Sequence, residues 1–139
     1  MKRFLVDASP LVAILSPDDE HHALCASTLK TLPQPLFSCW PVIAEAAWLL
    51  RPSHTAVLSL LNSIAGGFLA MLPLSDAEAA PIAKILEKYS DLRPQLADAA
   101  LVHLANRESI DTIFTLDHRD FSVYRSARNR QFRIIPDLR

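Results

Sequence analysis

Apolar residues follow two patterns along this chain, short uninterrupted runs and longer segments with helix signals. The first run covers residues 4–6, has no polar alternation and stops at Asp7. Such a run predicts a strand buried on both faces, as in a parallel sheet covered by helices. Ser9 suits an N-cap and Pro10 the first helical position, so we expect a helix within three residues of the strand. Asp7 should therefore lie in a tight strand-to-helix turn, where open parallel sheets bind ligands.

Four further apolar runs predict strands, and the segments between them predict helices. The predicted strands cover residues 36–38, 68–72, 112–116 and 132–135. The predicted helices cover residues 10–15, 18–32, 41–50, 55–64, 75–89 and 94–105. Alternating strands and helices indicate an α/β layer structure with a mainly parallel sheet. Because no repeat or linker interrupts the pattern, we expect one domain over residues 1–139.

Composition narrows the class of protein. Half of the 139 residues are hydrophobic, which is enough for one domain to bury a core without disulfides or metals. The net charge of −1 excludes a uniformly basic nucleic-acid binder but allows a local basic patch. Cys25 and Cys39 are too few for a disulfide framework, no signal peptide precedes the first strand, and no apolar run reaches the length of a membrane span. We therefore expect a soluble, cytoplasmic protein.

Four carboxylates stand out because their neighbours are apolar. Asp7 and Asp117 each end an apolar strand. Glu45 and Asp98 are each the only charged residue of an otherwise apolar helical segment. A helix that is apolar nearly all round is a buried one, so the last two side chains are expected to point inward.

One explanation is that each acid is an ordinary cap or a paired core residue, since Asp is common in turns and a lone buried carboxylate is usually paired. Arg51 lies six residues after Glu45, and Arg93 lies five before Asp98. Neither spacing puts the cation on the helix face of the carboxylate. Partners from other elements stay open at this point.

The other explanation is that the four acids converge at the strand ends. Two like charges about 4 Å apart repel by roughly 4 kcal/mol at an effective dielectric of 20, so a bare cluster would oppose folding or stay partly protonated. A divalent cation would relieve that conflict. Hard oxygen ligands, with no Cys or His at zinc-like spacing, favour Mg²⁺ or Mn²⁺.

The motifs around these acids resemble those of the PIN domain family. Val6-Asp7-Ala8-Ser9 stands near the start, and Glu45 lies in the helix after the second predicted strand. Ala97-Asp98-Ala99 opens a late helix, and Thr115-Leu116-Asp117-His118-Arg119-Asp120-Phe121 follows the fourth strand. The resemblance covers essentially the whole chain. Within the family, the size and the lack of appended domains are most similar to VapC-type toxins of bacterial toxin-antitoxin modules.

The resemblance implies a three-layer α/β sandwich with a five-stranded parallel sheet of order 3-2-1-4-5. It also implies a Mg²⁺- or Mn²⁺-dependent ribonuclease that is usually a homodimer and is paired with an antitoxin protein. By position, Asp7, Asp98 and Asp117 would hold the metal, directly or through water. Glu45 would complete the acidic pocket as a further catalytic residue.

Ser9 and Thr115 match polar pocket positions of that family. Asp120 belongs to the matching motif, and it either binds metal or caps the turn. The implied reaction is metal-assisted hydrolysis of an RNA phosphodiester bond that leaves a 5′-phosphate and a 3′-hydroxyl, with no side-chain nucleophile. The implied substrate is single-stranded or loop RNA, such as tRNA, because RNA loops expose backbone and bases.

Arginines gather after the fourth predicted strand, at Arg119, Arg125, Arg128 and Arg130. They form either a solvated loop before the last strand or an RNA-binding segment that contacts phosphates beside the pocket. Two neighbouring predicted helices also carry more apolar residues than one buried face needs, which predicts a groove for an antitoxin segment or a second protomer. These apolar residues are Trp48, Leu49, Leu50, Val57, Leu58, Leu60 and Leu61.

Three other functions bear comparison with this one, and two of them stay open. A PIN-type RNA-processing or repair nuclease would carry the same acids. A phosphoacceptor receiver domain also gathers acids and Mg²⁺ at strand ends, but it needs a lysine at the end of a late strand, where none of the four lysines lies. In a non-catalytic α/β interaction module the acids would be structural, and an RNA cleavage assay would separate that case.

Overall fold

The computed structural model describes residues 2–138, and its strands form one sheet. Neighbouring strands are parallel and follow the order β3-β2-β1-β4-β5. The strands are β1 (Leu5–Val6), β2 (Leu36–Ser38), β3 (Leu69–Met71), β4 (Thr112–Phe114) and β5 (Arg133–Ile135). The predicted strand order 3-2-1-4-5 is confirmed.

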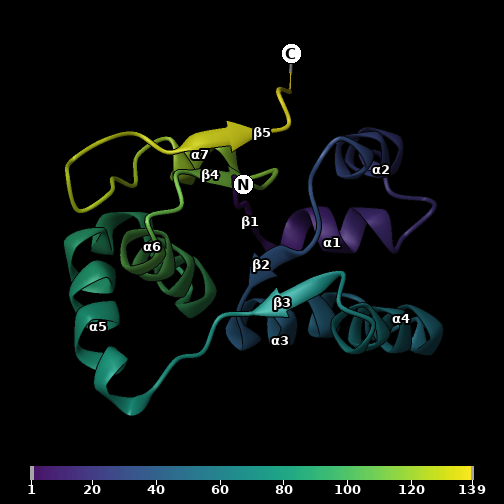
Figure 1. The fold of residues 1–139 in the computed structure, drawn as a ribbon, viewed down its shortest axis with the longest axis horizontal. Helices are drawn as coiled ribbons and strands as arrows, with labels where there is room; N and C mark the ends of the chain where they lie inside the picture. The colour runs from purple at the N-terminus through teal and green to yellow at the C-terminus, as the bar shows by residue number, and fades with distance from the viewer. Residues whose placement is uncertain (1, 139) are drawn as a thin grey trace.

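Helices cover both faces of the sheet, as Figure 1 shows, with α5 and α6 on one side and α1, α2 and α4 on the other. The α-helices are α1 (Ala8–Ile14), α2 (His22–Lys30), α3 (Trp40–Leu49), α4 (His54–Ala65), α5 (Ala79–Lys88), α6 (Leu96–Glu108) and α7 (His118–Phe121). Short 3-10 helices cover Asp76–Glu78 and Ser90–Leu92. The layers are those of the predicted three-layer sandwich. Within residues 2–138, no helix combines the length and the apolar character that crossing a bilayer requires.

The two central strands fix the place where the carboxylates emerge. Leu5 and Val6 of β1 pair with Ile113 and Phe114 of β4, and all four side chains are fully buried. Burying a large apolar side chain contributes about 1.5 to 3 kcal/mol, so this pairing is strongly held. The Asp7 N–H then donates to the Phe114 carbonyl oxygen at 2.9 Å. The carboxyl ends of β1 and β4 are therefore locked side by side.

Three predicted helix starts are wrong. The helix predicted to open at Pro94 begins at Leu96, because Gln95 is its N-cap. Asp7, and not Ser9, is the N-cap of α1, because its own carboxylate accepts a hydrogen bond from the Ala8 N–H at 2.8 Å. α2 begins at His22 and not at residue 18, because turns and a bend occupy residues 17–21. The capping box predicted at the start of the fifth helix is present, with Glu78 accepting from the Ser75 N–H.

The pattern of apolar residues does not predict two short helices. α7 has four residues and the 3-10 helix at Ser90–Leu92 has three, which is too short for a periodic signal. Two residues of the predicted apolar groove, Leu50 and Leu60, instead belong to the core, where they are 3% and 0% exposed. The groove predicted on the third and fourth helices is therefore narrower than the sequence indicates.

Candidate active site

The four predicted catalytic acids line one pocket of about 310 Å³. Asp7 lies in the turn from β1 to α1, and Glu45 lies on α3. Asp98 is in the first turn of α6, and Asp117 caps α7 just after β4. The pocket lies at the carboxyl ends of the central strands, where parallel sheets bind ligands. Four elements far apart in the sequence thus supply one cluster.

Asp7 is the most buried of these acids, with 5% of its surface exposed. One carboxylate oxygen accepts a hydrogen bond from the Ala8 N–H and the other from the Thr115 hydroxyl, both at 2.8 Å. Burial raises the pKa of Asp7 to about 6 despite these hydrogen bonds, and the charges of Glu45 and Asp117 add to the increase. The fold therefore holds Asp7 rigidly while making its charged form costly.

Two hydroxyls tie the start of α1 to the end of β4. Thr115 donates to Asp7, and its Oγ1 accepts a hydrogen bond from the Asp117 N–H at 3.0 Å. Ser9 Oγ accepts from the Leu116 N–H at 3.1 Å and lies 3.5 Å from Thr115 Oγ1. Ser9 lines the pocket, whereas Thr115 is fully buried and is not part of its wall. Thr115 thus orients two acids from beneath the pocket.

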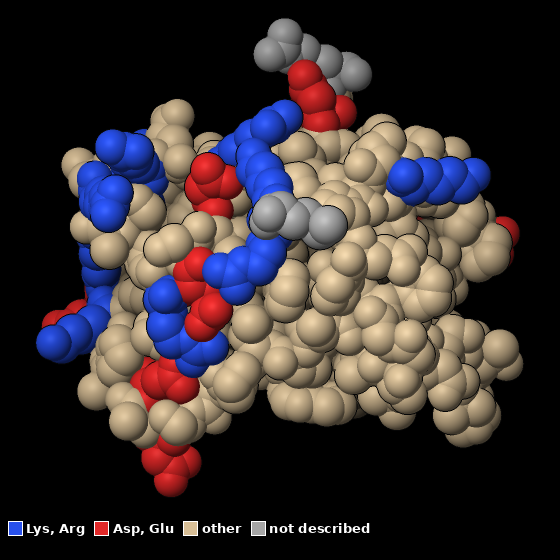
Figure 2. Space-filling view, in the orientation of Figure 1, with Lys and Arg blue, Asp and Glu red and all other residues tan. Residues whose placement is uncertain are grey.

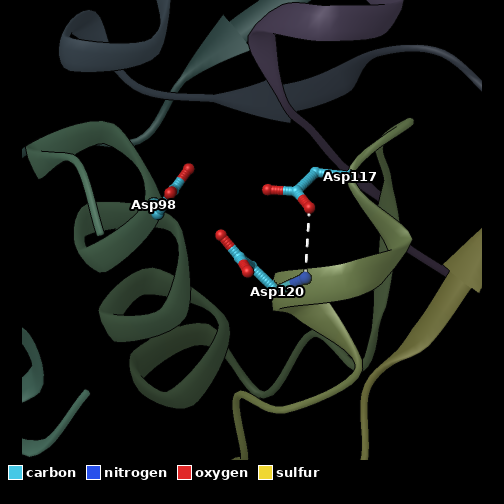
Figure 3. Close-up of side chains that lie close together, drawn as sticks. All are labelled: Asp98, Asp117 and Asp120. Atoms are coloured by element: carbon cyan, nitrogen blue, oxygen red, sulfur yellow. Dashed lines mark hydrogen bonds between the residues drawn. The ribbon is translucent and has the colours of Figure 1, made fainter. Parts of the chain in front are cut away.

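Asp98, Asp117 and Asp120 form a tighter group within the pocket, shown in Figure 3. Each offers a carboxylate oxygen, and these oxygens lie within 4.8 Å of one another. Asp98 points from α6 toward the two acids of the segment that follows β4. Asp117 Oδ1 accepts from the Asp120 N–H at 3.1 Å. Asp117 is therefore the cap of this turn, which leaves the Asp120 carboxylate available to the group.

Burial and repulsion act together on these acids. Burial, and then the charges of Asp7 and its other acidic neighbours, raises the pKa of Asp98 to about 7, against a hydrogen bond from the Gln95 N–H. The pKa values of Glu45 and Asp120 are also raised, chiefly by burial. Among residues 2–138, no Lys or Arg forms an ion pair with an acid of the pocket. These acids therefore lack the cationic partners that they would need if they were paired core residues.

The donor set fits a hard divalent cation. Every member of the close group is a carboxylate, and in the described part of the chain no Cys or His joins it. The neighbouring thiol of Cys39 is no alternative, because burial raises its pKa to about 11. Carboxylates that are desolvated and mutually repelling gain more from a bound cation than exposed ones do. Carboxylate oxygens are also the ligands that Mg²⁺ and Mn²⁺ prefer.

An aromatic cluster supports Asp98 from the protein interior. Tyr124 is fully buried, and its hydroxyl donates to Asp98 Oδ2 across 3.5 Å. The Tyr124 ring contacts Tyr89 and Phe121 edge to face, each with ring centres 5.0 Å apart. Sequence reasoning missed Tyr124, because a single Tyr in a loop gives no periodic or motif signal.

The four predicted RNA-binding arginines do not line the pocket. Arg119 lies near Asp120, and its charge acts to lower the pKa of that carboxyl. Arg125 donates to three backbone carbonyls of its own turn. Arg128 and Arg130 line a separate cavity of about 470 Å³ at the carboxyl end of α6. Any RNA contact from these residues would therefore lie beside the acidic pocket and not in it.

One cation does line the acidic pocket, and it is Arg93. The spacing of Arg93 from Asp98 does not match a helix face, so the sequence does not predict that the two residues meet. The one feature of the sequence that could have pointed to Arg93 is its position immediately before Pro94, at the entry to the helix that carries Asp98. Leu49 and Gln95 complete the polar and apolar rim.

Comparison with known proteins agrees with this architecture. The PIN domain family model matches residues 4–126, a span that contains all the pocket acids. The chain is 34% identical to Ribonuclease VapC26 of Mycobacterium tuberculosis over 134 residues, which cover 95% of this chain and 99% of that protein. The crystal structure of VapC20 of the same organism, described as a sarcin-ricin loop cleaving toxin, superposes with a TM-score of 0.73 at 14% identity over 79% of this chain and 86% of that one. The chain therefore belongs to the PIN domain family and resembles its VapC members.

Proposed function

We propose that this chain is a metal-dependent endoribonuclease and the toxin of a toxin-antitoxin pair. The observation that carries the proposal is the convergence of carboxylates on one pocket at the strand ends, where no Lys or Arg of residues 2–138 forms an ion pair with them. These acids are Asp7, Glu45, Asp98, Asp117 and Asp120. The name of the relative Ribonuclease VapC26 supports the same activity.

The close group provides the direct ligands of the proposed metal. Asp98, Asp117 and Asp120 would hold Mg²⁺ or Mn²⁺, because their oxygens already lie within 4.8 Å of one another. Asp7 would contribute directly or through water, since both of its oxygens already accept hydrogen bonds. Glu45 would add negative charge from α3, where burial, and then the charges of Asp98 and Asp117, already raise its pKa.

The bound cation supplies Lewis-acid stabilisation of the phosphodiester and lowers the pKa of a coordinated water. The protein supplies orientation. Thr115 holds the carboxylate of Asp7 and the backbone of Asp117 in one network, and the Tyr124 hydroxyl contacts Asp98. Ser9 is the only hydroxyl that residues 2–138 contribute to the pocket lining, and no His or Lys lies in that lining to activate it as a nucleophile. Direct hydrolysis by water is the reaction that this arrangement supports.

Single-stranded or loop RNA, such as tRNA, is the proposed substrate class. The pocket opens between helix ends, and its rim carries Leu49, which is 50% exposed, and the exposed Arg93. An apolar and a cationic side chain beside an acidic centre suit a splayed base and a backbone phosphate. The proposed place of action is the cytoplasm.

The test of this activity is cleavage of end-labelled tRNA and ribosomal RNA by the purified protein. We expect cleavage with Mg²⁺ or Mn²⁺, none with EDTA, and none by Asp117→Asn at either metal. The products should carry 5′-phosphate and 3′-hydroxyl ends, which ligation and kinase assays distinguish. Cleavage that persists in EDTA would contradict the metal dependence. An RNA that stays intact under all metal conditions would instead support a non-catalytic module.

The proposed protein partner is an antitoxin, and a second copy of the chain is the proposed oligomer. The exposed apolar residues of α3 and α4 are Trp40, Trp48, Leu49, Leu58 and Leu61, which are 42% to 63% exposed. Figure 2 shows that the molecular face over α1, α2 and α4 carries few charged side chains, whereas charges gather over α5, α6 and β5. A weakly charged surface with large exposed apolar residues suits a protein partner.

Expression in bacteria tests the toxin assignment. Growth should stop when the chain is produced alone and recover when the product of a neighbouring gene is produced with it. Light scattering of the purified protein measures the oligomeric state. Normal growth with soluble, wild-type protein and no antitoxin gene would favour an RNA-processing or repair nuclease.

A further inference from the structure

Arg93 lines the acidic pocket but is paired with none of its acids. Within residues 2–138, its side chain makes no hydrogen bond or salt bridge, and the residue is exposed. An arginine this close to several carboxylates would ordinarily be expected to pair with one of them. Its unpaired state therefore requires another explanation.

The backbone of Arg93 is held in a conformation that L-residues seldom adopt. Its φ of 50° and ψ of 55° lie in the left-handed region, and its N–H donates to the Ser90 carbonyl at 3.0 Å. Pro94 follows, which disfavours the right-handed helical region for Arg93 and fixes the entry to α6. Such left-handed residues concentrate at functional sites, where the surrounding structure maintains them. The Arg93 Cα is thus fixed at the pocket rim.

Neutralising the acids is not the role of Arg93. A cation that compensated them would lie within salt-bridge distance of a carboxylate, yet among residues 2–138 no ion pair joins Arg93 to an acid of the pocket. The hydrogen bond that the Asp98 carboxylate accepts at the start of α6 comes from the Gln95 backbone. The guanidinium of Arg93 therefore keeps its donors for a ligand.

The chemistry of that ligand follows from the guanidinium. Its planar fork of N–H donors matches the oxygens of a phosphate, which it can bind in a bidentate manner. The other candidate arginines are bound to other groups, distant from the acids, or, like Arg119 beside Asp120, outside the pocket lining. Arg125 is bound to backbone carbonyls, and the cavity of Arg128 and Arg130 lies beside Asn106, about 12 Å along α6 from Asp98 at 1.5 Å per residue.

We propose that Arg93 binds a backbone phosphate of the RNA at the mouth of the acidic pocket. This role rests on the proposed ribonuclease function. It places an anion-binding group on one wall and the metal-binding acids on another, so that one strand of RNA would contact both. Arg93 would then determine how firmly the RNA is held, whereas the acids would determine whether it is cut.

RNA binding by the full chain tests the proposal. The Asp98→Asn protein, in which cleavage should be absent, serves as the background, and the probe is a labelled pool of 20-nucleotide single-stranded RNAs of random sequence with Mg²⁺ present. Adding Arg93→Ala should weaken binding about tenfold, as expected for the loss of one hydrogen-bonded charge, and should lower the log-log salt slope by about 0.7. Arg93→Lys should keep the slope but recover only part of the affinity. Arg133→Ala, at the amino end of β5, is the matched control and should change neither value.

Mn²⁺ binding distinguishes a phosphate contact from a structural role. In otherwise wild-type protein, calorimetry should show Mn²⁺ affinity that is unchanged or tighter in Arg93→Ala, because a positive charge has been removed from the site. Weaker binding of both Mn²⁺ and RNA would mean that Arg93 only shapes the pocket, and unchanged RNA binding would also overturn the proposal. If the wild-type protein neither binds Mn²⁺ nor cleaves RNA, the ribonuclease function itself fails, and the role of Arg93 with it.

Discussion

Helix α6 carries two groups of charged side chains, and carboxyl pKa values are raised in one group and lowered in the other. Near its start, Asp98 faces Asp117 and Asp120, and burial with acidic neighbours raises its pKa to about 7. Further along, His103 and Arg107 both contact Glu78, the residue immediately before α5. The pKa of Glu78 is lowered to about 2, first by the backbone hydrogen bond from Ser75 and then by these partners.

The difference lies in the partners and not in the type of residue. Glu78 is charged because donors surround it, so its ionisation favours the folded state. Asp98 is surrounded by other acids, so its ionisation opposes folding until a cation binds. Helix α6 thus carries a candidate functional carboxylate, Asp98, and supplies two of the partners of a structural carboxylate, Glu78, that lies outside it. The contrast suggests that an acid held without a cationic partner is the better marker of a site.

Asp98→Asn should give the largest effect. It should abolish RNA cleavage, because it removes a proposed metal ligand, while the metal-free protein stays as stable or becomes more stable. A gain on the order of 1 kcal/mol would raise Tm by about 3 °C in a chain of this size. Calorimetry in EDTA and a cleavage assay in Mg²⁺ measure the two effects. The matched control is Asp18→Asn, an exposed acid outside the pocket.

A loss of about 3 to 5 kcal/mol in metal-free stability would contradict this view of Asp98. Such a loss is typical when one partner of a buried ion pair is removed. Asp98 would then resemble Glu78, and the two charged groups of α6 would no longer differ.

The metal-free protein should lose stability as the pH rises from about 4 to about 7. Asp7 and Asp98 have folded-state pKa values of about 6 and 7, above the ordinary 3.8, so over this range the folded state holds protons that the unfolded state has released. Mg²⁺ at 100 times its Kd should add about 2.7 kcal/mol at pH 7 and much less at pH 4. Thermal melts across pH, with and without Mg²⁺, measure both. A flat profile in EDTA would contradict the repulsion.

Glu78→Gln should lower Tm at neutral pH by a few degrees and leave cleavage and Mn²⁺ binding unchanged. The folded-state pKa of Glu78 lies below its ordinary 4.5, so its stabilisation is present above that pH and is lost as the pH falls toward 2. The variant should therefore show less acid sensitivity than the wild type. Glu87→Gln, an exposed acid on α5, is the control. Reduced cleavage by a folded Glu78→Gln protein would link the two groups of α6.

The smallest effect is expected at the carboxyl end of α6. Arg128→Ala combined with Arg130→Ala should flatten the salt dependence of RNA binding by about 1.4 log-log units, because each phosphate contact to a single strand contributes about 0.7. Cleavage at saturating RNA should persist, since these residues line a different cavity from the acids. Lys84→Ala on α5 controls for the loss of an exposed charge. An unchanged slope would mean that the RNA path avoids this end of the helix.

The sequence by itself determined the order of elements and the identity of the acids. Its short apolar runs marked β1 and β4 because a strand buried on both faces cannot alternate polar residues. Asp7 and Asp117 stand out because each ends such a run, and Asp98 because it is the only charged residue among residues 94–105. These signals are local, so they can be read without a fold. The strand order came from the family resemblance, since periodicity does not specify which strands pair.

Only the tertiary structure decided which charges meet. The sequence placed Arg93 off the helix face of Asp98, but a left-handed turn before Pro94 brings it to the pocket rim. From the sequence, Arg128 is expected beside the acids because it follows Asp117 and Asp120 closely in the chain. In the structure, a loop carries Arg128 to the other end of α6. Burial of Tyr124 against Asp98 likewise depends on three elements packing together. Charge and desolvation depend on distances through space, which the pattern of one chain leaves undetermined until its helices are packed on the sheet.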